Sequence, residues 1–132
     1  MRFSTNLRNK FAGGNFVTKH IFLLFQTSWI TKLDVEDAIA DRVASPVEQF
    51  EELADVLARV NPMSTNILIA ESHALVAADS TQLLDLSSQF KAILAISTER
   101  QVSLPKIIGN LIVLDAPFQE GDLAAALTKC GL

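Results

Sequence analysis

Four short apolar runs recur along the chain, and each ends at small or polar residues. They are Phe16–Phe25 (FVTKHIFLLF), Asn66–Ser72 (NILIAES), Ala92–Ser97 (AILAIS) and Leu111–Asp115 (LIVLD). Near-continuous apolar runs of this length, bounded by turn residues, are typical of strands that are buried on both faces of a sheet. The pattern therefore predicts four buried strands.

Helical signals separate these runs. A weak helix is predicted to cover part of Trp29–Ala40, where the apolar positions do not form one clean stripe. The sequence Ser45–Glu48 (SPVE) resembles a capping box with proline at the first helical position, and it predicts a helix over Val47–Val60. At most a very short strand, Arg42–Ala44, fits between these two helices.

Two further helices are predicted downstream. The segment Asp79–Phe90 has Asp79 and Gln82 as a second candidate cap pair, and a start nearer to His73 stays open. The segment Thr98–Ile108 holds only a short helix, because Pro105 interrupts it.

The last helix is predicted for Gln119–Cys130, with Leu123, Leu127 and Cys130 on its buried face. Strands and helices thus alternate to the end of the chain. Right-handed crossovers wind such an alternation into a three-layer, doubly wound, five-stranded parallel sheet with helices on both faces. This α/β architecture is flavodoxin-like, and folds of this kind bind ligands at the carboxyl edge of the sheet.

Residues 1–19 are basic, and we predict that they form a flexible leader ahead of one domain, residues 20–132. The leader holds four basic residues and no acidic residue. Its apolar residues Phe3, Leu7 and Phe11 recur every fourth position, so a transit-peptide character is the alternative. No stretch approaches about 18 consecutive apolar residues, so contact with a membrane is not expected.

Charge and cysteine content narrow the class of protein. Outside the leader, seven Lys/Arg against fifteen Asp/Glu give a net charge of −8, which argues against nucleic-acid binding. The single cysteine, Cys130, excludes an internal disulfide and fits a reducing compartment, so a cytoplasmic location is expected. His20 and His73 lack further ligands at metal spacing, and neither a metal nor a cofactor is predicted.

Over roughly residues 20–131 the chain resembles the receiver domain of two-component response regulators. The segment DRVASPVEQFEELADVL is similar to that family's second strand and second helix, and AILAIS is similar to its fourth strand. Ala116–Phe118 (APF) is similar to the Lys-Pro-Phe that follows its fifth strand. The resemblance implies a signalling module whose partner is a protein: a histidine kinase, a regulator, or a second copy in a homodimer.

An active receiver needs an acidic pair after its first strand to hold Mg²⁺, and an aspartate at the end of its third strand to accept the phosphoryl group. At the matching positions this sequence has Gln26 and Thr27, which carry no charge, and Glu71, which is one methylene longer than aspartate. The resemblance thus implies a degenerate acidic pair, with Glu71 as the equivalent of the phosphoacceptor.

Two further functional positions of the family are the switch Ser/Thr and a lysine, and this sequence matches only the first of them. Ser97 matches the family's switch Ser/Thr, whereas Ala116 replaces the lysine that contacts the phosphoryl group. Pro117 after it is kept, and the Ala116–Pro117 bond is expected to be cis, as this bond often is in receivers. The chain therefore resembles a pseudo-receiver, which has the scaffold without phosphotransfer and is not an enzyme.

Two interpretations of Glu71 stay open. In the first, its carboxylate supplies a permanent negative charge where a phosphate would sit, and a hydrogen bond from Ser97 holds an active-like state. In the second, Glu71 is a solvated carboxylate at the end of a strand. The first gives the residue a signalling role, and the second gives it none.

A second alignment also stays open. The segment ILIAESHALV resembles the first strand of many receivers, with Glu71 and Ser72 as the acidic pair and Asp115 as the phosphoacceptor. This register requires a permuted domain. The alternative functions are a phosphorylatable atypical receiver that uses Asp115 or Glu71, and a small α/β ligand-binding domain or enzyme that uses the same carboxylates.

Overall fold

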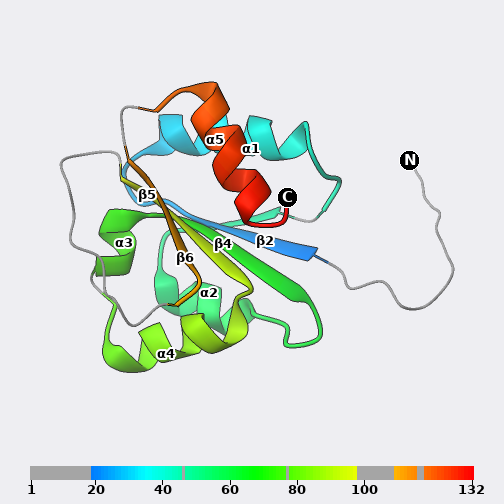
Figure 1. Ribbon diagram of the computed structural model, residues 1–132. Coiled ribbons are helices and arrows are strands. Elements are labelled where there is room, and N and C mark those ends of the chain that lie inside the picture. Colours follow the sequence, from blue (N-terminus) through cyan, green and yellow to red (C-terminus); the bar gives the residue numbers. More distant parts are fainter. Residues whose placement is uncertain (1–18, 46, 77, 98–108, 116–117) are drawn as a thin grey trace, which may run out of the picture.

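The computed structural model describes residues 19–45, 47–76, 78–97, 109–115 and 118–132 (Figure 1). Strands and helices alternate along these residues. In chain order the elements are β2 (Lys19–Leu24), α1 (Trp29–Ala40), β3 (Val47–Phe50), α2 (Leu53–Arg59), β4 (Thr65–Glu71), α3 (Ser72–Val76), α4 (Ser80–Gln89), β5 (Ala92–Ser97), β6 (Leu111–Asp115) and α5 (Glu120–Lys129).

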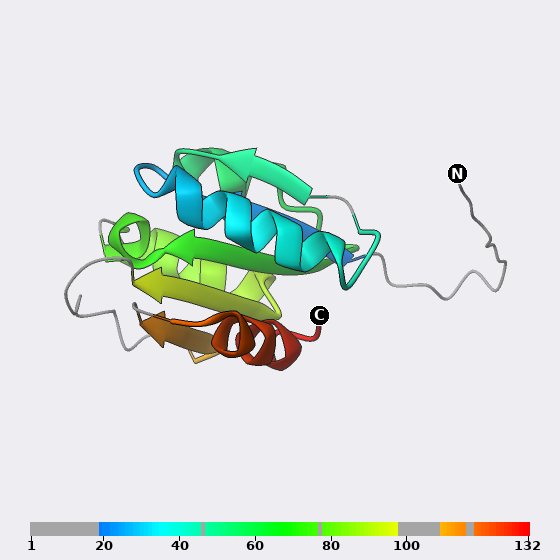
Figure 2. The same cartoon turned by 90° about the horizontal axis from the view of Figure 1, so that it is seen from above.

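The strands form one parallel sheet in the order β3-β2-β4-β5-β6. Figure 2 shows the strand arrows pointing the same way across the sheet. Helices α1 and α5 cover one face, and helices α2, α3 and α4 cover the other (Figure 1). This arrangement confirms the predicted three-layer, five-stranded parallel fold.

Successive residues of β2 alternate between two apolar cores, which explains its uninterrupted apolar sequence. Ile21 and Leu23 face the core under α1 and α5, whereas Phe22 and Leu24 face the core under α2, α3 and α4. All four side chains are fully buried. The ring of Phe22 also stacks on Phe50 of β3, with 5.9 Å between the ring centroids. Strand β2 thus contributes to both cores of the domain.

Most elements lie where the sequence pattern predicts them. Strands β5 and β6 have the predicted bounds, and β4 matches the predicted strand within one residue at each end. Helix α1 fills all of Trp29–Ala40, of which only a part was predicted to be helical. Strand β2 lies inside the predicted Phe16–Phe25, of which residues 16–18 are outside the described residues. Continuous apolar runs therefore located every strand that is covered on both faces.

Helix α4 begins at its predicted cap signal. Asp79 caps α4, because its side chain accepts a hydrogen bond from the backbone N–H of Gln82 at 2.8 Å. In return, the side chain of Gln82 accepts one from the N–H of Asp79 at 3.1 Å. The earlier start near His73 is a separate short helix, α3, and the last helix is α5, with Gln119 at its N-cap.

The predicted helix over Val47–Val60 is wrong in its first part. Val47–Phe50 instead form the edge strand β3, which pairs in parallel with Ile21–Leu24 of β2, and the helix begins only at Leu53. The pairing satisfies backbone groups along β2 and lets Phe50 pack on the sheet. These tertiary contacts outweigh a local capping signal.

Glu48 shows what replaces the predicted capping box. Its carboxylate accepts a hydrogen bond from the guanidinium of Arg59 at 2.9 Å. The same carboxylate lies 2.6 Å from Nε2 of His20. Glu48 therefore connects its edge strand to α2 and to β2, and is not available to cap a helix that starts at residue 46.

The predicted short strand Arg42–Ala44 is also wrong. Asp41 and Arg42 form a turn that ends α1, and the three residues that follow have no regular structure. The guanidinium of Arg42 donates hydrogen bonds to the hydroxyl of Thr128 and, at 3.3 Å, to the carbonyl of Leu132. The segment thus ties α1 to the end of α5 instead of pairing in the sheet.

Several predictions fall on parts of the chain that are not described. They are the leader up to residue 18, the short helix within Thr98–Ile108, and the cis bond between Ala116 and Pro117. Among the helices that the structure does describe, none is long and apolar enough to cross a membrane.

Candidate functional site

The carboxyl ends of the parallel strands meet at one edge of the sheet, which we call the carboxyl edge. Glu71 ends β4, Ser97 ends β5 and Asp115 ends β6. The chain first passes outward from β2 to β3 and then returns to β4 on the other side of β2. Open α/β sheets bind ligands at such a change of winding direction. Glu71 therefore lies at the position where a ligand site is expected.

Glu71 is buried against the loop between β2 and α1, and only 1% of the residue is exposed. Its Oε1 accepts hydrogen bonds from the backbone N–H of Gln26 and, at 2.9 Å, from that of Thr27. Its Oε2 accepts one from the Thr27 hydroxyl at 2.8 Å, and the side chain of Ser28 adds another hydrogen bond. Three consecutive loop residues thus hold this one carboxylate.

The surroundings of Glu71 act on its pKa in opposite directions. Burial raises the pKa of the carboxyl, because it disfavours the charged form. The hydrogen bonds from Gln26, Thr27 and Ser28 stabilise the charged form and outweigh burial, so the pKa lies below its ordinary value of 4.5. Glu71 is therefore ionised at neutral pH and anchors the loop.

This geometry tests the interpretation of Glu71 as a carboxylate that is exposed to solvent. Two carboxylate oxygens offer about four acceptor positions, and the loop supplies as many donors. The interpretation of Glu71 as a solvated strand-end carboxylate is wrong. Gln26 and Thr27, the predicted degenerate acidic pair, do lie beside Glu71, but they meet it chiefly through backbone N–H groups.

Ser97, the predicted switch equivalent, bonds to a different residue from the one expected. Its hydroxyl lies 2.9 Å from the hydroxyl of Ser72, and both serines are buried. The expected hydrogen bond from Ser97 to Glu71 is thus replaced by one that joins β5 to the start of α3. The sequence did not predict this pair, because the residues around Ser72 do not indicate that its hydroxyl contacts the end of β5.

We expect Ser97→Ala to lower the free energy of unfolding by about 1–2 kcal/mol, because it leaves the buried hydroxyl of Ser72 without its partner. The double variant Ser72→Ala/Ser97→Ala should cost less than the two single variants added together, since no unpaired hydroxyl then remains. Urea denaturation followed by circular dichroism measures all three variants. Strictly additive losses would contradict a bond between the two hydroxyls.

Asp115 is exposed at the end of β6, opposite Ser97 in the parallel register. The alignment that made it the phosphoacceptor requires β4 to be the first strand of a receiver. The next two strands, β5 and β6, would then flank β4 on opposite sides, but they follow it on one side. This alignment is therefore wrong. The matched lysine position, Ala116, lies outside the described residues.

Two hollows open at the carboxyl edge beside Gln26. The larger, of about 670 Å³, lies between the β2–α1 loop, the end of β3 and the start of α2. The smaller, of about 410 Å³, lies between α2, α3 and the start of α4. Both are lined by Gln26, Glu52 and Asp55. Sequence reasoning missed them because it treated residues 47–52 as helix, which hid the bend between β3 and α2.

Metal-binding side chains do not converge in the described part of the chain, where no group of three or more His, Cys, Asp or Glu could hold an ion. His20 is engaged with Glu48 near the start of β2. His73 is exposed on α3. The only cysteine, Cys130, is buried, and burial raises the pKa of its thiol to about 11.

Comparison with known proteins bears on the fold. No family model matches the sequence, and no match was found among curated proteins. One similar solved structure is a response regulator receiver domain protein from Bacillus halodurans. It is 17% identical, with a TM-score of 0.60, and the match covers 86% of this chain and 97% of that one.

A second similar structure is the lysine decarboxylase LdcF of Francisella novicida, which is 12% identical with a TM-score of 0.66. The match covers 87% of this chain but only 17% of the decarboxylase, so it concerns a small part of that enzyme. Identities this low establish a shared fold alone. The chain therefore has a receiver-like α/β fold, with the strand order second, first, third, fourth, fifth.

Proposed function

We propose that this chain is a pseudo-receiver: a receiver-like signalling module that acts through protein–protein contacts and is not phosphorylated. The observation that carries the proposal is the buried Glu71 carboxylate, whose oxygens are taken up by hydrogen bonds from Gln26, Thr27 and Ser28. A carboxylate oxygen with occupied lone pairs is a poor nucleophile toward a phosphoryl donor.

The charges around Glu71 support the same proposal. Phosphoryl transfer needs cations that neutralise the charge developing on the transferred group, and Mg²⁺ prefers carboxylate ligands for this role. Gln26 and Thr27 provide no such ligand, although they occupy the place of the acidic pair beside Glu71. We therefore expect weak Mg²⁺ binding and no phosphotransfer at this position.

Exposed apolar side chains support the protein-contact part of the proposal. Trp29, Ile30 and Leu33 lie in the first five positions of α1, and they are 62%, 64% and 46% exposed. Single exposed apolar residues are common, but a group of large ones on one helix is typical of an interaction surface. A kinase, a regulator or a second copy of the chain would bury this group.

Incubation with acetyl phosphate and Mg²⁺ is expected to leave the protein unlabelled. Intact-protein mass spectrometry measures the phosphorylated fraction, with an active receiver domain treated in parallel as the positive control. We expect no mass increase here, because the nucleophile is engaged and Gln26 and Thr27 offer no carboxylate to Mg²⁺. Stoichiometric labelling at Glu71 would refute the pseudo-receiver, and labelling at Asp115 would support a phosphorylatable atypical receiver instead.

A further inference from the structure

The two hollows beside Gln26 adjoin at three lining residues that they share, and we call the pair of hollows the carboxyl-edge groove. Its walls differ along its length. Trp29 and Phe50 line the end next to α1, and Leu53 and Ala74 line the end next to α3. Two adjoining hollows offer more room than one small ion fills. Their combined volume suits an extended peptide segment.

Three acidic side chains lie around the middle and outer rim of this groove: Glu51, Glu52 and Asp55. All three are exposed. Within the described residues their carboxylates form no ion pair, since the ion pairs found there belong to Glu48. Like charges that line one hollow repel one another, so a cation placed among them is favoured.

The start of α2 accounts for these charges only in part. Acidic residues in a first helical turn complement the helix dipole, and Asp55 is placed to do so. Glu52, however, stands at the N-cap without making a side-chain capping bond. Glu51 precedes the helix altogether. The acidic group is therefore larger than capping of α2 explains.

The lysine that lines the groove offsets only part of its negative charge, since one ammonium group lines the same hollow as three carboxylates. The ammonium of Lys32 donates a hydrogen bond to the side-chain carbonyl of Gln49 at 2.8 Å. The amide of Gln49 in turn donates to Glu36 at 2.6 Å. This chain of contacts holds the Lys32 charge toward α1 and β3. The carboxylates at the start of α2 are left for an outside cation.

Trp29 adds an aromatic surface beside this negative charge. Its indole is largely exposed, and it lines the same hollow as Glu51 and Asp55. A planar guanidinium stacks on an aromatic face and also forms paired hydrogen bonds with a carboxylate. An ammonium group is a compact, strongly hydrated charge and does this less well. The combination favours arginine over lysine.

We propose that the carboxyl-edge groove binds an arginine-bearing segment of a partner protein. The guanidinium lies between Trp29 and the carboxylates of Glu51, Glu52 and Asp55, and the neighbouring residues of the segment extend over Ala74. The inference rests on the proposed function, because it names the chemistry of the partner in that protein contact. Charge complementarity and the aromatic wall favour this occupant over an acidic or purely apolar one.

Titration with short capped peptides tests the proposal on the full chain. Trp29 is the single tryptophan, so its fluorescence emission reports occupation of the groove directly. We expect tri-arginine amide to change the emission saturably at low salt, tri-lysine amide to bind more weakly, and tri-glutamate amide not to bind. Added salt should weaken the tri-arginine interaction, because the attraction is between exposed charges.

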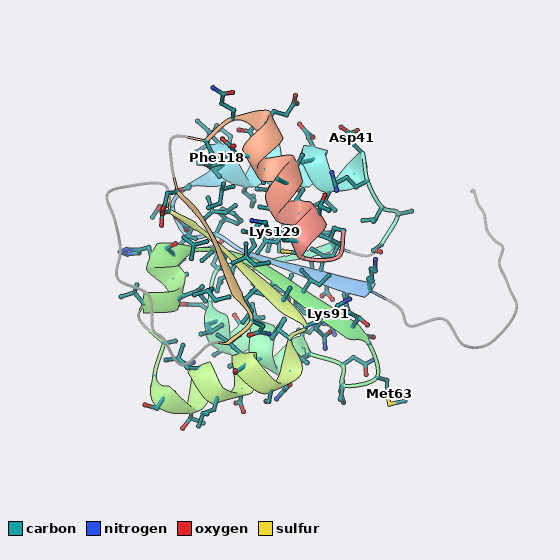
Figure 3. The ribbon with its side chains drawn as sticks, viewed as in Figure 1. Asp41, Met63, Lys91, Phe118 and Lys129 are labelled. Atoms are coloured by element: carbon teal, nitrogen blue, oxygen red, sulfur yellow. The ribbon has the colours of Figure 1, made fainter. Side chains whose placement is uncertain are left out.

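Calorimetric titration of variants then separates the groove from general attraction to an acidic protein. Glu51→Gln/Glu52→Gln/Asp55→Asn should weaken tri-arginine binding about tenfold. The matched control Asp34→Asn/Asp37→Asn/Asp41→Asn removes the same number of charges around the hollow between α1 and α5, where Figure 3 shows Asp41. It should change the affinity by less than about twofold.

Trp29→Leu serves if the acidic variant does not fold, since Trp29 is exposed and makes no contribution to either core. It should weaken tri-arginine more than tri-lysine. Equal effects of the two charge variants, equal binding of tri-lysine, or no tri-arginine binding would each overturn the inference. None of these outcomes alters the acetyl phosphate experiment, so the pseudo-receiver proposal can stand or fail separately.

Discussion

Replacing Glu71 with alanine is expected to lower the free energy of unfolding by about 3 kcal/mol at neutral pH. The change removes a buried carboxylate that accepts hydrogen bonds from Gln26, Thr27 and Ser28. Hydrogen bonds to a charged group are worth about 1.5–3 kcal/mol each, but they do not add here because they hold the same loop.

Glu71→Gln is the matched control for shape. Its amide oxygen can still accept hydrogen bonds from the loop, while the negative charge is lost. We expect a loss of about 1–2 kcal/mol, which is smaller than for alanine. Urea denaturation followed by circular dichroism measures both variants. Equal stability of the alanine variant and the wild type would show that Glu71 does not anchor the β2–α1 loop.

The stabilisation from Glu71 also depends on pH in a defined direction. Its pKa is lower in the folded protein than its ordinary value of 4.5. Its contribution is therefore fully present above that value and is lost as the pH falls through the folded-state pKa. The stability difference between wild type and Glu71→Gln should shrink on acidification below about pH 4.5. A constant difference would contradict the lowered pKa.

The fold could be predicted from the sequence where burial is two-sided. Ala92–Ser97 is a continuous apolar run because successive residues face different cores. Leu111–Asp115 keeps this pattern in part, since it lies at the edge of the sheet and its Val113 is exposed. A run of that kind has a clear beginning and end, so its bounds are visible locally. The order of the strands is not visible in these runs, because right-handed crossovers fix the face that each helix covers and leave open the reversal that places β3 and β4 on opposite sides of β2.

The edge strand could not be predicted in the same way. Val47–Phe50 is only four residues long and alternates between exposed and half-buried positions. Ser45–Glu48 carries a helix-start signal in the same place, and the local pattern favours it. What decides the outcome is pairing with Ile21–Leu24, a contact between segments far apart in the sequence. The same limit hid the bend that opens the carboxyl-edge groove.

The position of the candidate site could be predicted from the sequence, but the hydrogen bonds within it could not. A carboxylate at the end of a central strand marks Glu71 from sequence, and the family resemblance places Gln26 and Thr27 beside it. Nothing in the sequence states that loop N–H groups turn toward the carboxylate, because that depends on the path of the β2–α1 loop. The burial of Glu71 is therefore a finding of the structure, and it changes the residue from a surface charge into an anchor.

Thr27→Asp restores a carboxylate to the degenerate acidic pair, and it is expected to destabilise the protein by about 2–3 kcal/mol at neutral pH. The Thr27 hydroxyl lies 2.8 Å from Oε2 of Glu71, so an aspartate there loses a hydrogen bond and brings a second negative charge close. Thr27 is exposed, and screening by water keeps the cost below that of a fully buried pair.

Thr27→Asn is the matched control, since it has nearly the same shape as aspartate and no charge. The difference in unfolding free energy between the two variants measures the repulsion between the new aspartate and Glu71. It should shrink as the pH falls, because protonation of either carboxyl removes one of the two charges. Mg²⁺ should stabilise the aspartate variant more than the asparagine variant, because adjacent carboxylates suit a hard cation. Equal stability of the two variants at neutral pH would mean that the charge of Glu71 does not act at position 27.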